Sequence, residues 1–159
     1  MADVEQPPVL LRPIGAADLP ALYQWQSDPE ASRMAVVNPR SRDNFDHHWQ
    51  GVLVDPTVRA RAIVVDGQLV GTVSCFARDG RAFVGYWIDR AWWNRGIASR
   101  ALVALLAEEP RRPLYAMAAR SNGASVRVLR RCGFVWLRDE WTPATERFPA
   151  CLEAFFELR

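Results

Sequence analysis

The chain has 159 residues, half of them hydrophobic, and a formal net charge of only +2. These values predict a folded domain with a packed core and exclude a disordered chain. The small charge gives no support for nucleic-acid binding, and no apolar run approaches the roughly 20 residues that cross a membrane. All twenty basic residues are arginine, which excludes a lysine nucleophile.

The first half of the chain alternates between strand and helix patterns. Asp18 is expected to cap the first helix, and Ser41 or Asp43 the second. Asp66 and Gly67 lie between two β-rich runs and predict a type I′ hairpin, because that turn needs positive φ at both positions. We expect strands at residues 9–12, 62–65, 68–76 and 82–88, and helices at residues 19–25 and 45–53.

The second half alternates regularly between helix and strand patterns. A helix begins near Gly96 and ends before Pro110, and Gly133 suits the left-handed residue after a later helix. We expect strands at residues 114–118, 134–137 and 151–158, and a helix at 122–132. The order β-α-α-β-β-β-α-β-α-β-β predicts one α/β (α+β) domain over residues 1–159, with a mixed sheet of six or seven strands and helices on both faces.

The three cysteines, Cys75, Cys132 and Cys151, are far apart and have no CxxC spacing. Their odd number and the absence of an apolar signal segment argue against disulfides, so we expect a reduced cytoplasmic protein. No cluster of metal-ligand residues is present in the sequence, so no metal is expected. The oligomeric state stays open, with a homodimer as one alternative.

The segment from Ile88 to Arg100 combines a strand end, a short loop and a helix start. Small residues stand at Gly96, Ala98 and Ser99, where the first N–H groups of the helix have no internal partner. Such a helix start suits a phosphate, and Arg95 and Arg100 add positive charge there. An ordinary strand–helix turn with surface arginines is the alternative, since neither a P-loop nor a complete Rossmann motif is present.

Two motifs in this order resemble those of the GNAT acetyltransferase superfamily, in particular its RimJ/RimL-like branch. Trp93-Asn94-Arg95-Gly96-Ile97-Ala98 resembles the family's cofactor loop. The later signature N-x-x-S…L-x-x-x-G-F is matched by Asn122, Ser125, Leu129, Gly133 and Phe134. The resemblance extends over roughly residues 9–137.

The resemblance implies the GNAT fold, in which a mostly antiparallel sheet contains two parallel strands that splay apart around acetyl-CoA. These strands would be the one ending at Ile88 and the one at residues 114–118. Asn94 is expected in the left-handed conformation. Arg130 or Arg131 would reach the adenosine 3′-phosphate, unless both are simply exposed helix charges. The implied cofactor-binding residues are Trp87, Ile88, Trp93, Asn94, Arg95, Gly96, Ile97, Ala98, Ser99, Arg100, Asn122, Ser125 and Arg131.

The catalytic groups are less well defined by the resemblance. Leu129 stands where many members carry a tyrosine that protonates the CoA thiolate, so Ser125 is the candidate acid, or else a cap or core hydroxyl. Asn122 is the helix N-cap, a pantetheine contact, or both. Asp89 and His48 are candidate bases, with a turn aspartate and a solvent-facing helix histidine as the alternatives.

The expected function is therefore N-acetylation of a primary amine, either a peptide N-terminus or a small molecule, by direct attack on acetyl-CoA. A catalytically idle acyl-CoA sensor is the alternative, because the usual tyrosine is missing and no carboxylate base is evident. A nucleotide-binding or redox domain is the third hypothesis, which the incomplete phosphate motifs disfavour.

Overall fold

A computed structural model describes residues 5–159 of the chain. Seven strands, five α-helices and two short 3₁₀ turns follow one another over these residues. In chain order they are β1 (Val9–Pro13), η1 (Ala16–Asp18), α1 (Leu19–Gln26), α2 (Pro29–Ala35), α3 (Arg42–Val54), β2 (Arg59–Val65), β3 (Gln68–Arg78), β4 (Arg81–Ile88), η2 (Arg90–Trp92), α4 (Ile97–Glu108), β5 (Leu114–Ala119), α5 (Gly123–Arg131), β6 (Val135–Thr142) and β7 (Cys151–Leu158).

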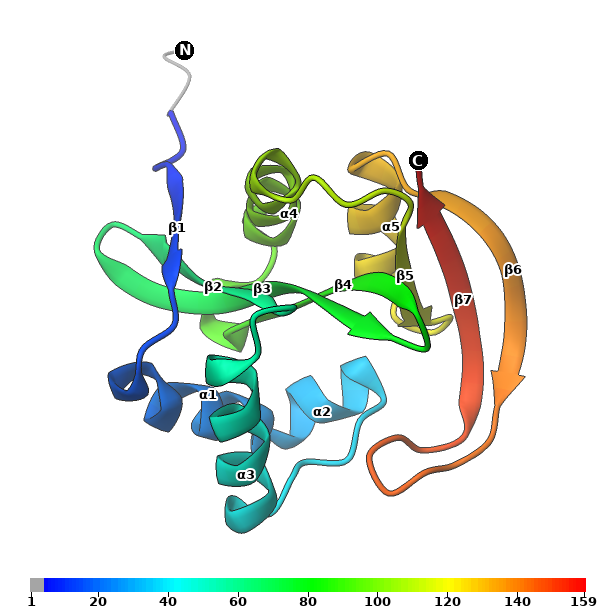
Figure 1. Ribbon diagram of the computed structural model, residues 1–159, viewed down its shortest axis with the longest axis horizontal. Coiled ribbons are helices and arrows are strands. Elements are labelled where there is room, and N and C mark those ends of the chain that lie inside the picture. Colours follow the sequence, from blue (N-terminus) through cyan, green and yellow to red (C-terminus); the bar gives the residue numbers. More distant parts are fainter. Residues whose placement is uncertain (1–4) are drawn as a thin grey trace.

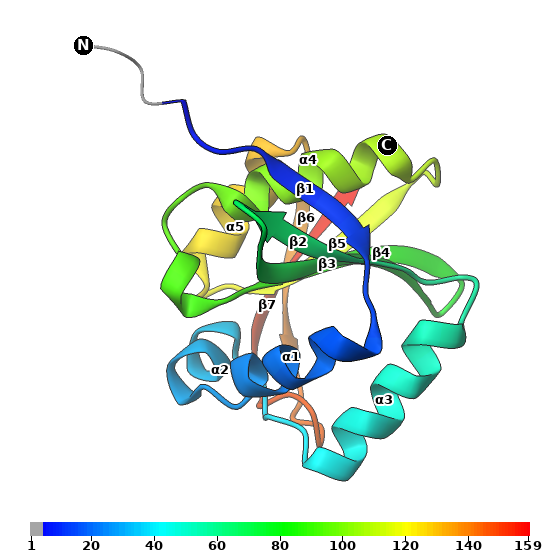
Figure 2. The ribbon, with the colours of Figure 1, turned by 90° about the vertical axis from the view of Figure 1, so that its left-hand side faces the viewer.

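The seven strands form one mixed sheet in the order β1-β2-β3-β4-β5-β7-β6. Only β4 and β5 pair in parallel, and every other neighbouring pair is antiparallel. The helices α4 and α5 cover one face of the sheet, and α1, α2 and α3 lie on the other (Figure 1; Figure 2). The predicted mixed sheet with helices on both faces is thus confirmed.

The turns follow the predicted glycine chemistry. Asp66 and Gly67 have φ values of 50° and 73°, as a type I′ turn between β2 and β3 requires. Gly133 has φ 91° and ends α5, with its N–H bonded to the Arg130 carbonyl and that of Phe134 bonded to the Leu129 carbonyl. This pattern is a Schellman motif, which satisfies the last free carbonyls of the helix.

Two local predictions near the N-terminus need correction. The helix α2 was not predicted from the sequence; it has seven residues and begins at Pro29, with the Asp28 side chain accepting from the Glu30 N–H. Its shortness left no repeated apolar spacing to detect. Asp18 stands before α1 but makes no side-chain cap to it. Its carboxylate instead accepts from the Gly15 N–H and from the Arg12 guanidinium, both at 2.8 Å.

The parallel pair β4–β5 separates soon after it forms. The two strands are in register only at Ala82–Leu114 and Phe83–Tyr115, whereas β5 stays paired with β7 as far as Ala119. The end of β4 therefore has β3 on one side and no strand on the other. This is the splayed pair that the sequence resemblance implied.

The main hydrophobic core lies between the sheet and the helices α4 and α5. Leu102 and Leu105 of α4, Leu114 of β5 and Phe156 of β7 are all fully buried there. A second cluster, around Phe45 and Leu22, packs α1 and α3 against the opposite face. Among residues 5–159, no helix is long and apolar enough to cross a membrane.

Glu109 is a buried charge that ties the end of α4 to the sheet. Its side chain is 2% exposed and accepts hydrogen bonds from Arg111 at 2.8 Å and from Arg59 at 3.0 Å. These bonds, first of all those from Arg111, lower the pKa of Glu109 to about 2 against an ordinary value of 4.5. The ionised carboxylate therefore stabilises the fold.

We predict that Glu109→Gln lowers the free energy of unfolding by about 2 kcal/mol at pH 7, less than the full pKa shift implies, because both arginines are partly solvated. The pKa of Glu109 is lowered in the folded state, so its contribution is complete above pH 4.5 and is lost as the pH falls toward 2. Urea denaturation at pH 7 and pH 3.5 measures both effects. Glu108→Gln, at a neighbouring residue with a 36% exposed side chain, is the control. Equal losses in the two variants would contradict this role.

Candidate functional site

A cavity of about 540 Å³ opens beside the splayed end of β4. Its walls come from the end of β4, the segment from η2 to the start of α4, one face of α5 and one side of α2. The lining residues are Ala31, Met34, Ala35, Tyr86, Trp87, Ile88, Trp92, Trp93, Asn94, Arg95, Gly96, Ile97, Ala98, Ser99, Asn122, Gly123, Ala124, Ser125, Arg127, Val128 and Arg131. The cavity thus occupies the gap that the separation of β4 from β5 creates.

The first turn of α4 presents backbone N–H groups to this cavity. Asn94 and Gly96 have φ values of 61° and 69°, which turn the chain sharply into the helix and confirm the left-handed Asn94. The first helical bond runs from the Arg100 N–H to the Gly96 carbonyl, so the N–H groups of residues 97–99 have no partner within the helix. In the described part of the chain no side chain caps this end, which leaves the helix start open to an anion.

Arginines surround this helix start, and they differ in what they bind. Arg95, Arg127 and Arg131 line the cavity, and none of them has a carboxylate within 4 Å among residues 5–159. Arg127 and Arg131 are four residues apart on α5 and so share one helix face. Arg100 lies outside the cavity lining and donates to the carbonyls of Pro7 at 2.7 Å and Arg95 at 3.2 Å.

The end of β4 contributes backbone and aromatic groups. The Asp89 N–H bonds to Val70 of β3 at 2.9 Å, so strand alternation turns the main-chain groups of Ile88 and Tyr86 toward the gap. The Trp93 indole N–H donates to the Ile88 carbonyl at 2.9 Å, which fixes the loop against the strand. The Trp87 indole N–H is buried without a hydrogen-bond partner in the described part of the chain.

Ser125 is bonded to a tyrosine that the sequence analysis did not single out. The Ser125 hydroxyl and the Tyr86 hydroxyl are 2.6 Å apart, and the Tyr86 hydroxyl also donates to the Ser125 carbonyl at 3.2 Å. Burial raises the pKa of Tyr86 to about 12, so its hydroxyl stays protonated near neutral pH. Asn122 caps α5 by accepting from the Ser125 N–H at 3.2 Å, which holds the serine at the cavity wall.

The two candidate bases do not line the cavity. Asp89 caps the η2 turn and accepts from the Ala91 N–H at 3.3 Å. His48 lies on α3 against the ring of Trp49. Burial, together with the charges of Arg40 and Arg147, lowers the pKa of His48 to about 4. No aspartate, glutamate or histidine lines the cavity among residues 5–159.

The cavity brings together every predicted cofactor-binding residue except Arg100. Nine lining residues were not predicted from the sequence: Ala31, Met34, Ala35, Tyr86, Trp92, Gly123, Ala124, Arg127 and Val128. The i, i+4 spacing from Arg131 could have revealed Arg127. Nothing in the local pattern points to Tyr86, because its role depends on the gap between β4 and α5. Residues 5–159 contain no group of three or more His, Cys, Asp or Glu side chains that could hold a metal ion.

Comparisons with known proteins agree with this arrangement. Residues 9–135 match the family model described as "Acetyltransferase (GNAT) domain". No curated protein matches the chain in sequence.

Several solved structures share the fold at low sequence identity. A RimL ribosomal L7/L12 alpha-N-protein acetyltransferase in complex with coenzyme A has a TM-score of 0.78 and 21% identity over 95% of this chain and 93% of that one. The microcin C7 self-immunity acetyltransferase MccE, in complex with acetyl-CoA and AMP, has a TM-score of 0.78 and 15% identity over 97% and 92%. Spermidine N-acetyltransferase from Vibrio cholerae, in complex with CoA and spermine, has a TM-score of 0.78 and 16% identity over 94% and 95%.

We predict that Gly96→Ala lowers the free energy of unfolding by about 1 kcal/mol, because an alanine is strained at positive φ. The cost is conformational, since no atom lies within 4 Å of the added Cβ. Gly51→Ala, in the middle of α3 and equally free of contacts, is the control and should stabilise the protein by about 0.5 kcal/mol. Chemical denaturation of both variants tests this. A stabilising Gly96→Ala would show that the left-handed turn into α4 is wrong.

Proposed function

Since the chain belongs to the GNAT acetyltransferase family, by a match over residues 9–135, we propose that it transfers an acetyl group from acetyl-CoA to a primary amine. The observation that carries this proposal is the open first turn of α4 beside the splayed end of β4. A phosphate-bearing thioester needs an anion site and an extended slot next to each other, and the cavity provides both.

The pyrophosphate of CoA is assigned to the N–H groups of Ile97, Ala98 and Ser99. Backbone donors at a helix start bind phosphate without a dedicated side chain. Ala98 and Ser99 are small and the Ile97 side chain is buried in the core, which allows close approach. Arg95, Arg127 and Arg131 lie around the same opening without carboxylate partners in residues 5–159. They would compensate the remaining phosphate charge, including that of the 3′-phosphate. Arg100 contributes indirectly by holding the Arg95 carbonyl.

The pantetheine arm is assigned to the free side of β4. Its amides can pair with the main-chain groups of Tyr86 and Ile88 as a missing strand would. The Ile88 carbonyl already accepts from Trp93, which leaves the Ile88 N–H available in this stretch. A backbone N–H of β4 next to the thioester would also stabilise the oxyanion that forms when the amine attacks.

The reaction is direct attack of a neutral amine on the thioester carbonyl carbon. The new C–N bond forms, the C–S bond breaks, the amine nitrogen loses a proton and the departing thiolate gains one. Ser125 is proposed to give that proton to sulfur. The Tyr86 hydroxyl, 2.6 Å from the Ser125 hydroxyl, can then give a proton back to the serine. Because no carboxylate or imidazole from residues 5–159 lines the cavity, the proton of the acceptor ammonium is proposed to leave through water rather than directly to Asp89 or His48.

Two acceptor classes are proposed as alternatives, a peptide N-terminus and a small-molecule amine. The RimL structure is that of an alpha-N-protein acetyltransferase, and the Vibrio cholerae enzyme acts on spermidine, so relatives of the same fold include both classes. A cytoplasmic location and a homodimer are compatible with the proposal. No acidic or histidine side chain from residues 5–159 lines the cavity. This observation favours one alternative, an idle acyl-CoA sensor.

A thiol-release assay with acetyl-CoA and a panel of primary amines separates the enzyme from the sensor. Turnover with any amine establishes the transferase. Saturable binding of acetyl-CoA without turnover across peptide and small-molecule amines supports the sensor. Absence of CoA binding by a folded protein contradicts both.

We predict that Ala98→Glu weakens CoA binding at least 100-fold, because it places a carboxylate at the proposed pyrophosphate site. Position 98 is preferable to Gly96, whose φ of 69° makes any side chain strained. A glutamate in the first turn of a helix favours folding, so loss of binding would not reflect unfolding. Ala98→Gln adds nearly the same volume without charge and should bind much more tightly than Ala98→Glu. Calorimetry measures both, and equal affinities would contradict the assignment.

We predict that Ser125→Ala lowers kcat about 100-fold and Tyr86→Phe about tenfold, because each removes one hydroxyl of the proposed proton path to sulfur. The dissociation constant of CoA should change less than about threefold in both variants, since neither hydroxyl is assigned to the phosphates. Steady-state rates and calorimetry give the two quantities. Full kcat in Ser125→Ala would remove this serine from the mechanism.

A further inference from the structure

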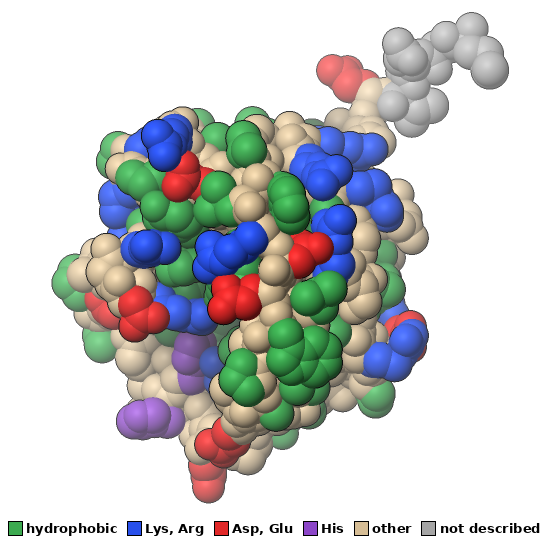
Figure 3. Space-filling view, turned by 90° about the vertical axis from the view of Figure 1, so that its right-hand side faces the viewer, with side chains coloured by type: hydrophobic (Ala, Val, Ile, Leu, Met, Phe, Trp, Pro, Cys, Tyr) green, Lys and Arg blue, Asp and Glu red, His purple; other side chains and the backbone are tan. Residues whose placement is uncertain are grey.

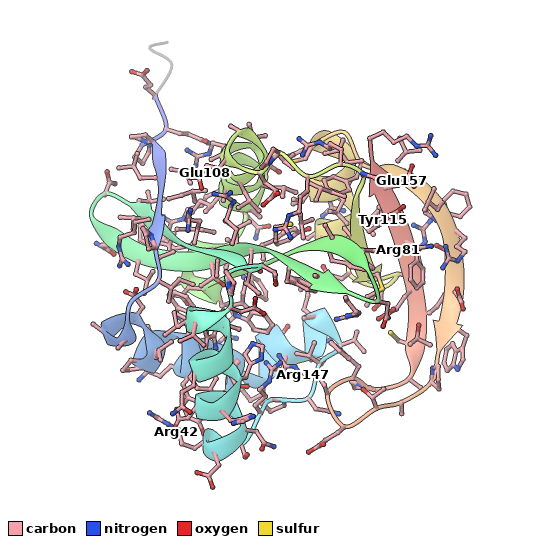
Figure 4. The ribbon with its side chains drawn as sticks, viewed as in Figure 1. Arg42, Arg81, Glu108, Tyr115, Arg147 and Glu157 are labelled. Carbon is pink, nitrogen blue, oxygen red and sulfur yellow. The ribbon has the colours of Figure 1, made fainter. Side chains whose placement is uncertain are left out.

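Two arginines from distant parts of the sequence come together on the face of the sheet opposite α4 and α5. Arg40 precedes α3, and Arg147 belongs to the segment between β6 and β7. The two segments are joined at Asn38, whose N–H donates to the Arg147 carbonyl at 2.7 Å and whose side chain donates to the Glu146 carbonyl at 3.1 Å. Figure 4 shows Arg147 in the space bounded by α2, α3 and this segment. Backbone and side-chain bonds therefore fix where this arginine lies.

Neither guanidinium is neutralised by the protein. Across residues 5–159, no carboxylate lies within 4 Å of Arg40 or Arg147. Both side chains are half-buried. Burial and the charge of Arg40 lower the pKa of Arg147 to about 10, and burial lowers that of Arg40. Both remain charged at neutral pH, so the fold holds two mutually repelling cations in a partly desolvated place, which costs stability.

His48 is the third member of this group, and it is uncharged at neutral pH because its pKa is about 4. On the face seen in Figure 3, histidine and basic side chains border a depression beside the outer strands. By contrast, the nearby Arg42 is paired with Asp46 at 3.2 Å and lies over the ring of Tyr23. The chain therefore pairs its ordinary surface arginine and leaves the two half-buried ones unpaired.

We propose that Arg40 and Arg147 form an anion site for the acceptor, so that the enzyme acetylates primary amines that also carry a carboxylate or phosphate. This inference rests on the proposed function. Ala35 of α2 lines the cavity and Arg40 follows it by five residues, so at most about 17 Å of chain separates Arg40 from the cavity wall. An acceptor held by its acidic end between the two guanidiniums can extend its amine toward the thioester.

A bound anion would compensate the repulsion between Arg40 and Arg147 in the free protein. Two guanidiniums offer several donors to a carboxylate or phosphate, and charge-assisted bonds in a half-buried place are strong. Amines without an acidic group do not relieve the repulsion between the arginines, and polyamines add further positive charge to it. The site thus favours acidic acceptors and disfavours polycationic ones, through repulsion as well as attraction.

Matched acceptors test the inference directly. Phosphoethanolamine is compared with ethanolamine, and β-alanine with β-alaninamide, at saturating acetyl-CoA. We expect kcat/KM to be at least tenfold higher for each acidic member. Arg40→Gln and Arg147→Gln should remove most of this preference. They should raise KM for the acidic member of each pair and change KM little for the member without an acidic group. The two pairs distinguish a phosphate from a carboxylate preference.

Control variants separate charge from structure. Arg42→Gln removes a neighbouring paired arginine and should keep the preference, and Arg147→Lys keeps the charge and should retain part of it. Arg147 also donates to the Asn38 carbonyl, so its loss can loosen the segment. The Arg40 side chain makes no hydrogen bond or ion pair among residues 5–159, so Arg40→Gln should fold normally. Thermal denaturation checks both variants.

A binding measurement keeps this inference distinct from the proposed function. In protein saturated with CoA, which occupies the α4 anion site, phosphoethanolamine should raise the pKa of His48 measured by NMR, because it neutralises Arg40 and Arg147. Arg40→Gln should weaken this response. Equal kcat/KM within each acceptor pair, or an unchanged His48 titration, would overturn the anion site while leaving acetyl transfer intact. Absence of transfer to every amine would contradict the proposed function, and the NMR titration would still decide the anion site.

Discussion

The early separation of β4 from β5 is the constraint on which the rest of the site depends. A parallel pair normally continues its ladder, because unpaired main-chain groups inside a protein are costly. Here the β4–β5 ladder stops after two residue pairs, whereas β5 remains paired with β7 along its whole length. The main chain at the end of β4 is left to bind something other than a strand. The indole of Trp93 satisfies one carbonyl, and the rest of that edge faces the cavity.

The helix start at α4 is useful only because the strand gap lies beside it. The left-handed Asn94 and Gly96 reverse the chain within a few residues, which brings the free N–H groups of α4 next to the free edge of β4. Two sets of unsatisfied backbone donors therefore face one cavity. A ligand with phosphates at one end and amides further along would satisfy both sets, so the proposed recognition of CoA depends more on backbone geometry than on particular side chains.

How much the sequence predicted varies with the range of the interactions. The turns at Asp66-Gly67 and Gly133, the Asn122 cap and the left-handed Asn94 before α4 were predictable, because each depends on residues within a few positions. The short helix α2 was not, since its seven residues contain no repeated pattern. Tyr86 was missed for another reason: its partner Ser125 is 39 residues away. Arg40 and Arg147 are 107 positions apart, and no local pattern could join them.

The use of arginine instead of lysine has a physical consequence at the two half-buried cations, Arg40 and Arg147. Burial and the charge of Arg40 lower the pKa of Arg147 from 12.5 to about 10, yet the guanidinium stays charged at neutral pH. The same burial and neighbouring charge would also lower the pKa of a lysine, which starts from a lower ordinary value of about 10.4. Such a lysine would still be charged at neutral pH, but it would lose its charge at a lower pH than arginine does, so it would bind an anion over a narrower pH range. Arginine at these two positions therefore keeps a permanent positive charge in surroundings that disfavour it, as the proposed anion site requires.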